Sequence, residues 1–338
     1  MDNFAQVLRE GKSKAGLNDE AHPASLLKGL KSAYTSQLES FATGRDPRRI
    51  YAVVVGIDNY SSYPLRGCVT DALAMEKCLV EVIGVPKERI QTLLGPRNQH
   101  DANVSSIPSR AKILSALRSL LTKADIKHGD PIVVFFAGHG SRYAWSDLDD
   151  DKNFGSDNEH SPARAGFVEA LCPLDRDNVP DISDRELNTV FSQIYRTGGH
   201  PITVILDCCH GGGATRSPRV RTIPPDSLRA MLHTGEEGLI DLLCHQSILA
   251  KNWCPDIDSH VVVAACGESE LVQEVQTVVR EGAGCRGAFT SALINTLRSG
   301  ALGEGATYEN LIKALPHLPS QTPVAEGKRK NMCLWYQI

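Results

Sequence analysis

Two segments carry most of the structural information in this sequence: Pro-Ile-Val-Val-Phe-Phe-Ala-Gly-His-Gly at residues 131–140 and Pro-Ile-Thr-Val-Ile-Leu-Asp-Cys-Cys-His-Gly-Gly-Gly at residues 201–213. Each begins with a continuous apolar run, which is typical of a strand buried on both faces. Each then changes at once to polar residues flanked by glycine, among them His139 and Cys209. The two segments predict buried parallel strands with reactive side chains at their carboxyl ends.

The rest of the main domain alternates between the two patterns. Apolar runs predict further strands, and apolar residues at helical spacing predict helices between them. The further strands are expected at 51–57, 90–94, 260–265 and 331–336, and the helices at 67–83, 109–123, 184–195, 287–298 and 307–315. This alternation predicts an α/β fold whose mainly parallel central sheet has helices on both faces. Because sites in such sheets gather at the carboxyl ends of the strands, His139 and Cys209 are expected to meet there.

Two regions depart from this pattern. The N-terminal segment has leucines at helical spacing and predicts a helical appendage, either packed on the main domain or available to a partner. The region after the second quoted segment is rich in proline and arginine, and we expect a long loop with a short helix near 239–250. The expected division of the chain is 1–46 for the appendage, 47–213 for a larger part, 214–258 for the linker loop and 259–338 for a smaller part.

Composition excludes several classes of protein. The formal net charge of -4 disfavours a nucleic-acid-binding domain, which is normally basic. No apolar run approaches the roughly 20 residues that span a bilayer, and charges occupy the place where a signal peptide needs an apolar core. The ten cysteines are scattered without a Cys-x-x-Cys pair, which argues against a zinc site or a disulfide framework. Free thiols of this kind predict a reducing compartment, and we expect a cytoplasmic protein.

His139 and Cys209 suit a general base and a nucleophile. Cysteine attacks as its thiolate, and a nearby imidazole generates or stabilises that form. The N–H of Cys209, with those of Gly140 and of the glycines at 211–213, could bind the oxyanion of a tetrahedral intermediate. Taken singly, either residue is more often a loop histidine or a buried thiol; the equivalent, glycine-flanked placement of both favours catalysis. His210 is a rival base, but as the nucleophile's neighbour it is poorly placed for the reaction.

These residues resemble the motifs of the metacaspases, a branch of the caspase-like cysteine peptidases. The segment Asp207–Gly212 resembles the family's nucleophile motif, with Cys209 at the nucleophile position and Cys208 at one often held by serine, and Phe135–Gly140 resembles the histidine motif. Further matches follow in order at Val55–Tyr60, Leu65–Ala72, Cys172–Asp175, Ile182–Leu187 and Arg286–Thr290. The resemblance runs from about residue 50 to 338. It implies a caspase-like three-layer sandwich and a cysteine endopeptidase with a His139–Cys209 dyad.

The resemblance also implies an acidic pocket that accepts arginine or lysine before the scissile bond. Cys68, Asp71, Ala137 and Asp207 stand at the family's pocket positions. Position 137 is often serine in the family, so we expect one pocket hydrogen bond to be absent here. A buried carboxylate needs a cation or several hydrogen bonds, and a guanidinium supplies both. The alternative is that the two aspartates cap a helix and a turn.

An acidic segment raises the question of calcium. Residues 147–186 contain twelve acidic and four basic side chains, and hard cations such as Ca²⁺ prefer carboxylate ligands. The resemblance implies calcium activation through Asp184, Glu186 and Asp147, but Arg185 replaces one expected acid. The alternative is a solvated acidic loop without a bound cation. No other cofactor is expected.

The linker loop and the expected edge strand of the sheet lead to further expectations. Arg216, Arg219 and Arg221 are expected self-cleavage sites, unless they are ordinary solvated residues. The family resemblance implies a monomer acting on proteins or peptides, with neither nucleic acid nor membrane as a partner, although an edge strand at 331–336 would leave pairing with a second copy open. Two competing functions are a non-catalytic caspase-like scaffold and a different thiol enzyme; the latter has no phosphate-binding glycine motif to support nucleotide chemistry.

Overall fold

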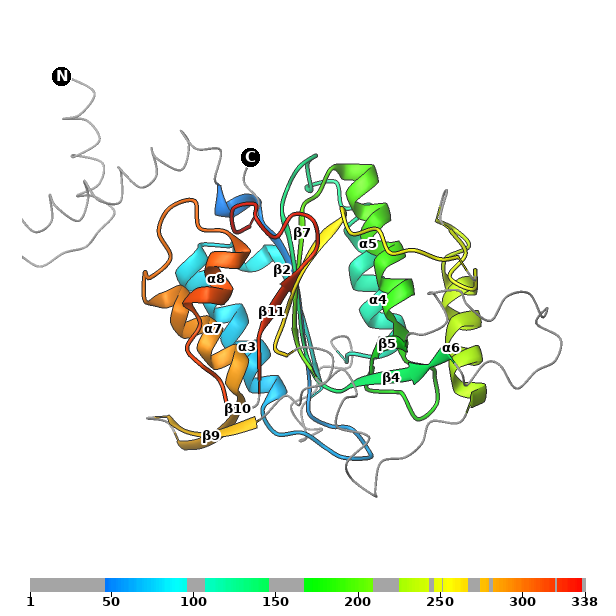
Figure 1. The fold of residues 1–338 in the computed structure, drawn as a ribbon, viewed down its shortest axis with the longest axis horizontal. Helices are drawn as coiled ribbons and strands as arrows, with labels where there is room; N and C mark the ends of the chain where they lie inside the picture. Colours follow the sequence, from blue (N-terminus) through cyan, green and yellow to red (C-terminus); the bar gives the residue numbers. More distant parts are fainter. Residues whose placement is uncertain are drawn as a thin grey trace, which may run out of the picture. The chain divides into compact units, whose positions relative to one another are not determined.

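The central feature of the computed structural model is a six-stranded sheet with helices on both faces (Figure 1). The structure describes residues 46–95, 107–145, 167–208, 225–242, 246–250, 252–266, 274–279, 282–319 and 321–335. The strand order is β11-β8-β7-β3-β1-β2, and all neighbours are parallel except β11 and β8. The predicted α/β fold with a mainly parallel sheet is therefore confirmed.

The strands form where long apolar runs occur. They are β1 (Tyr51–Ile57), β2 (Ile90–Gly95), β3 (Ile132–Ala137), β7 (Ile202–Asp207), β8 (His260–Ala264) and β11 (Val324–Glu326). Every residue of β1 and β3 is buried, as expected for the middle of a sheet covered on both sides.

Helices form the two outer layers. Five of them lie against the sheet where the sequence predicts helices: α3 (Cys68–Cys78), α4 (Arg110–Ser119), α5 (Asp184–Gly198), α7 (Ala288–Arg298) and α8 (Tyr308–Ala314). Short helical turns occur at Pro47–Arg49, Leu79–Ile83 and Lys87–Arg89. Figure 1 places α3, α7 and α8 on one face and α4 and α5 on the other.

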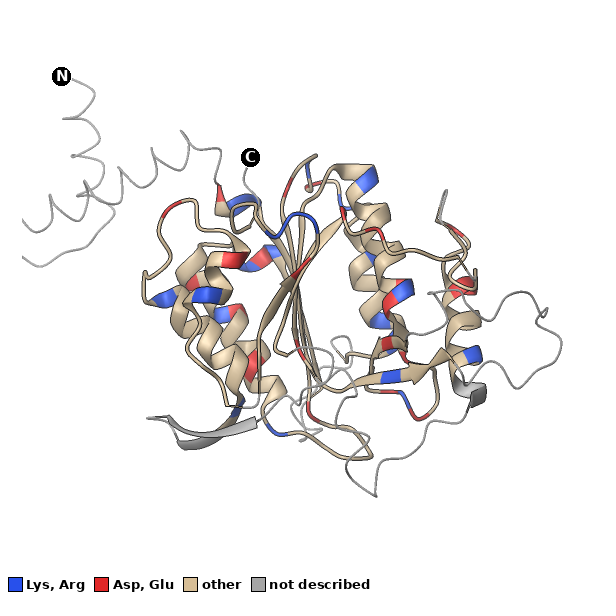
Figure 2. Cartoon of the chain, viewed as in Figure 1, with Lys and Arg blue, Asp and Glu red and all other residues tan. Residues whose placement is uncertain are grey.

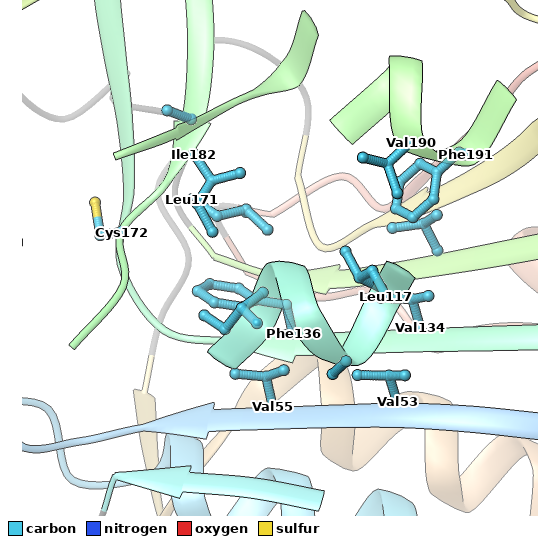
Figure 3. Packing of buried hydrophobic residues seen from close by; sticks show 14 of the residues in the cluster. Val53, Val55, Leu117, Val134, Phe136, Leu171, Cys172, Ile182, Val190 and Phe191 are labelled. Carbon is cyan, nitrogen blue, oxygen red and sulfur yellow. The ribbon is translucent and has the colours of Figure 1, made fainter. Parts of the chain in front are cut away.

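Successive side chains along each strand point to opposite faces of the sheet, and they fill two separate hydrophobic cores. Val53 and Val55 point towards α4 and α5, where they pack with Val134 and Phe136 of β3 and Leu117 of α4 (Figure 3). The residues that alternate with them along the same strands, such as Val54 and Phe135, point to the opposite face and pack beneath α3, α7 and α8. This division follows from the two-residue period of a strand.

Two smaller antiparallel units, which the sequence did not reveal, adjoin the main sheet. One contains β4 (Gly140–Ala144), β5 (Phe167–Leu171) and β6 (Ile182–Ser183), and the other is the hairpin of β9 (Glu274–Val279) and β10 (Gly282–Gly287). β4 begins immediately after His139, and β10 leads directly into α7. Both units therefore place residues from outside the main sheet near the carboxyl ends of its strands.

Two expectations for the second half of the chain are wrong. Of the strand expected at 331–336, the structure describes residues 331–335, and these do not form a strand: Cys333 makes an isolated bridge with Thr307, and Trp335 has a positive φ of 58° that a strand does not allow. The edge strand next to β8 is β11 instead. In the linker, the helix lies not at 239–250 but earlier, as α6 (Pro225–Gly238). Its residues Leu228, Met231 and Leu232 are buried in the core on the α5 side, and proline is favoured in a first helical turn.

Charged side chains lie mainly on the outer helices and connecting segments, and few lie on the central sheet (Figure 2). Within the described part of the chain, no helix is both long and apolar enough to cross a membrane. The expected N-terminal appendage lies almost wholly outside the described residues. The proposed division into larger and smaller parts stays a prediction.

Candidate active site

His139 is held by main-chain hydrogen bonds immediately beyond β3. Its N–H donates to the Tyr60 hydroxyl at 3.0 Å, and its carbonyl accepts from the Cys172 N–H at 3.0 Å. The Tyr60 hydroxyl in turn donates to the Cys172 carbonyl at 2.9 Å, and the Tyr60 ring lies 4.6 Å from the imidazole, centroid to centroid. Tyr60 is buried, so this connection is shielded from water. Three segments distant in the sequence thus fix the position of His139.

Gly138 is required by the same arrangement. A Cβ atom at position 138 would lie 2.6 Å from the Tyr60 hydroxyl and 2.9 Å from the ring of Phe136. Real Cβ atoms do not approach other atoms so closely without displacing them. The glycine before His139 therefore allows the close approach of Tyr60.

The imidazole is oriented by a main-chain carbonyl. His139 Nε2 lies 2.7 Å from the carbonyl oxygen of Tyr63, and because a carbonyl only accepts hydrogen bonds, Nε2 carries the proton. Nδ1 is then the nitrogen that can take a proton from a thiol. Tyr63 has a positive φ of 57°, which is uncommon for a residue other than glycine and is found at functional sites.

The register of β3 and β7 relates the two predicted catalytic positions. Ala137 is paired with Asp207, and the Gly138 N–H donates to the Asp207 carbonyl at 3.4 Å. His139 and Cys209 each follow this pair by two residues. Cys209 itself lies outside the described residues, but Cys208 is described: it is buried in the core beneath α4 and α5.

Several other predicted site residues also lie outside the described residues. They are Asp147, the glycines at 211–213, and Arg216, Arg219 and Arg221. Gly140 is described and is the first residue of β4, next to His139.

The two predicted pocket aspartates both lie close to Gly287. The Gly287 N–H donates to Asp71 Oδ2 at 2.7 Å, while Thr290 donates to Asp207 Oδ2 from its N–H at 3.2 Å and from its hydroxyl at 2.5 Å. A Cβ at position 287 would lie 2.2 Å from Asp207 Oδ2 and 3.0 Å from Asp71 Oδ2. Asp71 and Asp207 are only 1% and 3% exposed. Residues 287–290 thus hold two carboxylates that come from α3 and from the end of β7.

Cys68 and Ala137 complete this neighbourhood. Ala137 is paired across the sheet with Gly56, and a Cβ on Gly56 would lie 2.6 Å from the Cys68 carbonyl oxygen. The Cys68 N–H donates to Asp58 Oδ1 at 2.9 Å at the start of α3. All four predicted pocket residues therefore lie near the carboxyl ends of β1, β3 and β7.

Burial shifts the pKa of Asp71. Removal from water, followed by the negative charge of Asp207, raises the pKa of Asp71 to about 8, although the Gly287 N–H and the charge of Arg286 act in the opposite direction. Within the described part of the chain, Asp71 Oδ1 is buried and has no hydrogen-bond partner.

The structure does not support Glu186 as a calcium ligand. Both of its carboxylate oxygens accept hydrogen bonds from the Arg110 guanidinium, at 3.0 and 2.8 Å, and the two side chains are buried. Asp184 accepts the Arg185 N–H at 2.7 Å in the first turn of α5, and burial raises its pKa to about 6. No group of three potential metal-ligating side chains occurs among the described residues.

Arg185 occupies the place where the resemblance led us to expect another acid. Its guanidinium lies 4.3 Å from the ring centroid of Trp145 and 4.6 Å from that of Trp253, and it donates to the Ile248 carbonyl at 2.8 Å. This cation therefore attaches the 246–253 region to α5.

Sequence reasoning missed Tyr60, Tyr63, Gly287 and Thr290 as contributors to the site. Tyr60, Gly287 and Thr290 occur within the motifs that carry the family resemblance, so a signal for them exists in the sequence. Tyr63 acts through its carbonyl, which every residue possesses, and its side chain gives no such signal.

Comparison with known proteins gives consistent matches. Residues 51–218 match the family described as metacaspase, peptidase C14 domain. Metacaspase-4 of Arabidopsis thaliana is 35% identical over 165 residues, which cover 48% of this chain and 33% of that protein. Metacaspase-1B of Aspergillus oryzae is 31% identical over 195 residues, covering 57% of this chain and 40% of that protein. This chain therefore spans about a third to two fifths of the length of these curated relatives.

A solved structure supports the fold. The crystal structure of protein GSU0716 from Geobacter sulfurreducens superposes with a TM-score of 0.50 at 21% identity, covering 84% of this chain and 99% of that one. At this identity the likeness concerns the fold alone. Together with the family match, it agrees with an α/β sandwich of the caspase-like kind.

Proposed function

The chain belongs to the metacaspase family, and from this premise we propose that it is a cysteine endopeptidase that cleaves proteins after arginine or lysine. In this proposal Cys209 is the nucleophile and His139 the general base. The His139 Nδ1 takes the thiol proton as sulfur attacks the carbonyl carbon, and it returns the proton to the leaving amine when the carbon–nitrogen bond breaks. Water then hydrolyses the acyl-enzyme.

The observation that carries this proposal is the pairing of Ala137 with Asp207 at the ends of β3 and β7. Because each catalytic candidate follows this pair by two residues, covalent geometry keeps both near the same edge of the sheet; consecutive Cα atoms are about 3.8 Å apart. The hydrogen bond from Nε2 to the Tyr63 carbonyl supports the role of His139, since it leaves the other ring nitrogen for the thiol. The N–H groups of Cys209 and Gly140 are the proposed oxyanion donors.

The preference for a basic residue rests on Asp71 and Asp207. Two buried carboxylates at one place attract a cation far more strongly than an apolar or acidic side chain. A guanidinium can donate to both carboxylates, and a lysine ammonium can do so as a point charge. Ala137, paired with Asp207 across the sheet, is fully buried, and its methyl side chain offers no hydrogen bond.

A direct test compares peptides that differ in the residue before the scissile bond. Fluorogenic peptides with arginine or lysine are expected to be cut, and the same peptide with aspartate is not. Cys209→Ala is expected to abolish cleavage, whereas Cys208→Ala, the matched control, retains much of it because Cys208 is buried in the core. Cleavage after aspartate, or full activity in the Cys209 variant, would overturn the proposal.

Labelling separates this function from its competitors. An arginyl peptide chloromethyl ketone is expected to modify Cys209, located by peptide mass mapping. Labelling of Cys209 without turnover of any peptide would instead favour a scaffold with a residual reactive thiol. Labelling that ignores the arginine side chain would favour another type of thiol enzyme.

Calcium activation and self-processing belong to the same proposal. Asp184 and Asp147 are the remaining candidate ligands, and the test is the hydrolysis rate with a chelator and with millimolar Ca²⁺. Self-cleavage is proposed at Arg216, Arg219 and Arg221, and their replacement by glutamine should leave a single band on a denaturing gel. We further propose that the protein is a cytoplasmic monomer, to be checked by fractionation and by sedimentation.

A further inference from the structure

We propose that the Asp71–Asp207 pair holds one shared proton when empty and releases it when the cationic side chain of a substrate enters, with Gly287 and Thr290 as the positioning residues of the pair. This inference rests on the proposed function of the pocket. It adds a proton exchange, and it assigns a role to the segment that joins β10 to α7.

The positioning role follows from which oxygen atoms are already bonded. Gly287 occupies Asp71 Oδ2, and Thr290 occupies Asp207 Oδ2 with two donors. Asp71 Oδ1 stays buried without a hydrogen-bond partner in the described part of the chain. An acceptor left in this state carries a desolvation penalty unless it is protonated or meets a donor. The fixed Oδ2 therefore determines where the other oxygen is presented.

Only glycine at position 287 permits this arrangement. A side chain there would begin 2.2 Å from Asp207 Oδ2 and 3.0 Å from Asp71 Oδ2, so it would separate the two carboxyl groups. The missing side chain allows a main-chain N–H to lie between two buried acids. The hydroxyl of Thr290 completes the set from the first turn of α7.

The charges around Asp71 favour a bound proton in the empty pocket. Asp207 from β7 and Asp58, which follows β1, are negative, and Arg286 of β10 is the positive group that acts on it. Two buried carboxyl groups so close together do not both ionise readily, and the proton belongs to the pair. The raised pKa of Asp71, about 8, agrees with this expectation from geometry.

The exchange conserves charge within the pocket. The empty pair with one proton carries a charge of about -1, and the pair without it carries about -2. Entry of one guanidinium or ammonium group while one O–H bond breaks restores the value to about -1, and the proton passes to the solvent buffer. Because the cation and the proton compete, cation binding should tighten as the pH rises towards the pKa of the pair and become independent of pH above it.

The experiment uses benzamidine as the probe and the full-length protein. Calorimetric titration in two buffers of different ionisation enthalpy measures the protons released on binding. We expect close to one proton per benzamidine at about pH 6 to 7 and none above about pH 9, with affinity falling up to tenfold for each pH unit below the pair's pKa. Asp71→Asn should abolish the release and make the weakened binding independent of pH over this range.

Substitutions at Thr290 test whether it positions the pair, because a residue that only stabilises the fold would not shift the pH dependence of benzamidine binding. Removing the hydroxyl in Thr290→Val takes a donor from ionised Asp207, so the midpoint of the affinity–pH curve should move upwards by about one unit. Thr290→Ser keeps the hydroxyl and should restore the midpoint. An unmoved midpoint in Thr290→Val would remove this residue from the proposal.

The outcomes distinguish this inference from the proposed function. Benzamidine binding that is independent of pH and releases no proton would overturn the exchange while leaving proteolysis intact. No binding at any pH would overturn both the pocket assignment and the exchange. Proton-linked binding in a protein that cuts no peptide would support the exchange and refute the peptidase.

Discussion

Replacing Tyr60 by phenylalanine removes one oxygen atom and tests how His139 is held. That oxygen accepts the His139 N–H at 3.0 Å and donates to the Cys172 carbonyl at 2.9 Å. In the variant both main-chain groups lose this partner. A buried polar group left unsatisfied costs about 1–3 kcal/mol; Cys172 is fully buried and carries most of this, whereas His139 is half-exposed. We therefore expect the free energy of unfolding to fall by about 2–3 kcal/mol.

The activity of the Tyr60→Phe variant should fall even under conditions where the variant is fully folded. A small displacement of a catalytic group can reduce the rate up to about 100-fold, so we expect kcat/KM for an arginyl peptide to fall about 10- to 100-fold. Burial raises the pKa of Tyr60 well above its ordinary value, so the native hydroxyl keeps its proton throughout the working pH range. Urea denaturation and steady-state kinetics measure the two effects.

The matched control is Tyr143→Phe. The Tyr143 hydroxyl is also buried, and its hydrogen bond at 2.8 Å goes to Asp181 rather than directly to the main chain of His139. This variant should lose a comparable amount of stability and keep its kcat/KM at temperatures where it is folded. If Tyr60→Phe behaves in the same way, the Tyr60 hydroxyl stabilises the fold without positioning the imidazole, and the reasoning is refuted.

Three further predictions concern other contacts. Glu186→Gln weakens the buried pair with Arg110 and should lower the free energy of unfolding, measured by urea titration, by up to about 3–5 kcal/mol. The response of the activity to calcium should not change; a changed response would make Glu186 a candidate calcium ligand again. Burial lowers the pKa of His260 to about 4, so stability should be complete above about pH 6.5 and decline as the pH falls towards 4; a His260→Gln variant with the same acid profile would contradict this. Gly138→Ala places a Cβ 2.6 Å from the Tyr60 hydroxyl and should cost about 1–3 kcal/mol together with activity, which thermal melts and kinetics would detect; wild-type values would mean that Tyr60 moves aside freely.

The buried strands could be predicted because their sequence is apolar on both faces. β1 and β3 are buried at every residue, and their apolar runs match the observed bounds to within a residue. β4 could not be recognised in this way, since Gly-Ser-Arg-Tyr-Ala alternates and contains no continuous run. The last apolar run was misleading for the opposite reason: Leu334 and Trp335 pack against the core from irregular backbone, where Trp335 donates its N–H to the Tyr308 hydroxyl.

The candidate site was predictable where motifs carry it and unpredictable where distant contacts build it. Asp71 and Asp207 could be named from their positions, and the structure brings them together. The contact between Asp71 and Gly287 joins residues 216 positions apart, which no local pattern reveals. The ion pair of Glu186 could not be predicted because its partner, Arg110, lies on another helix.

The pairing of β7 with β8 has a consequence for a severed molecule. These strands come from opposite sides of the 208–259 stretch, yet they are adjacent and parallel from Ile202 against His260 to Leu206 against Ala264. Hydrolysis of a single peptide bond in that stretch would therefore yield two polypeptides that stay associated through the backbone hydrogen bonds of β7 and β8. Thr290 of one fragment would still donate a hydrogen bond to Asp207 of the other. Two species in detergent would migrate as one particle in native buffer.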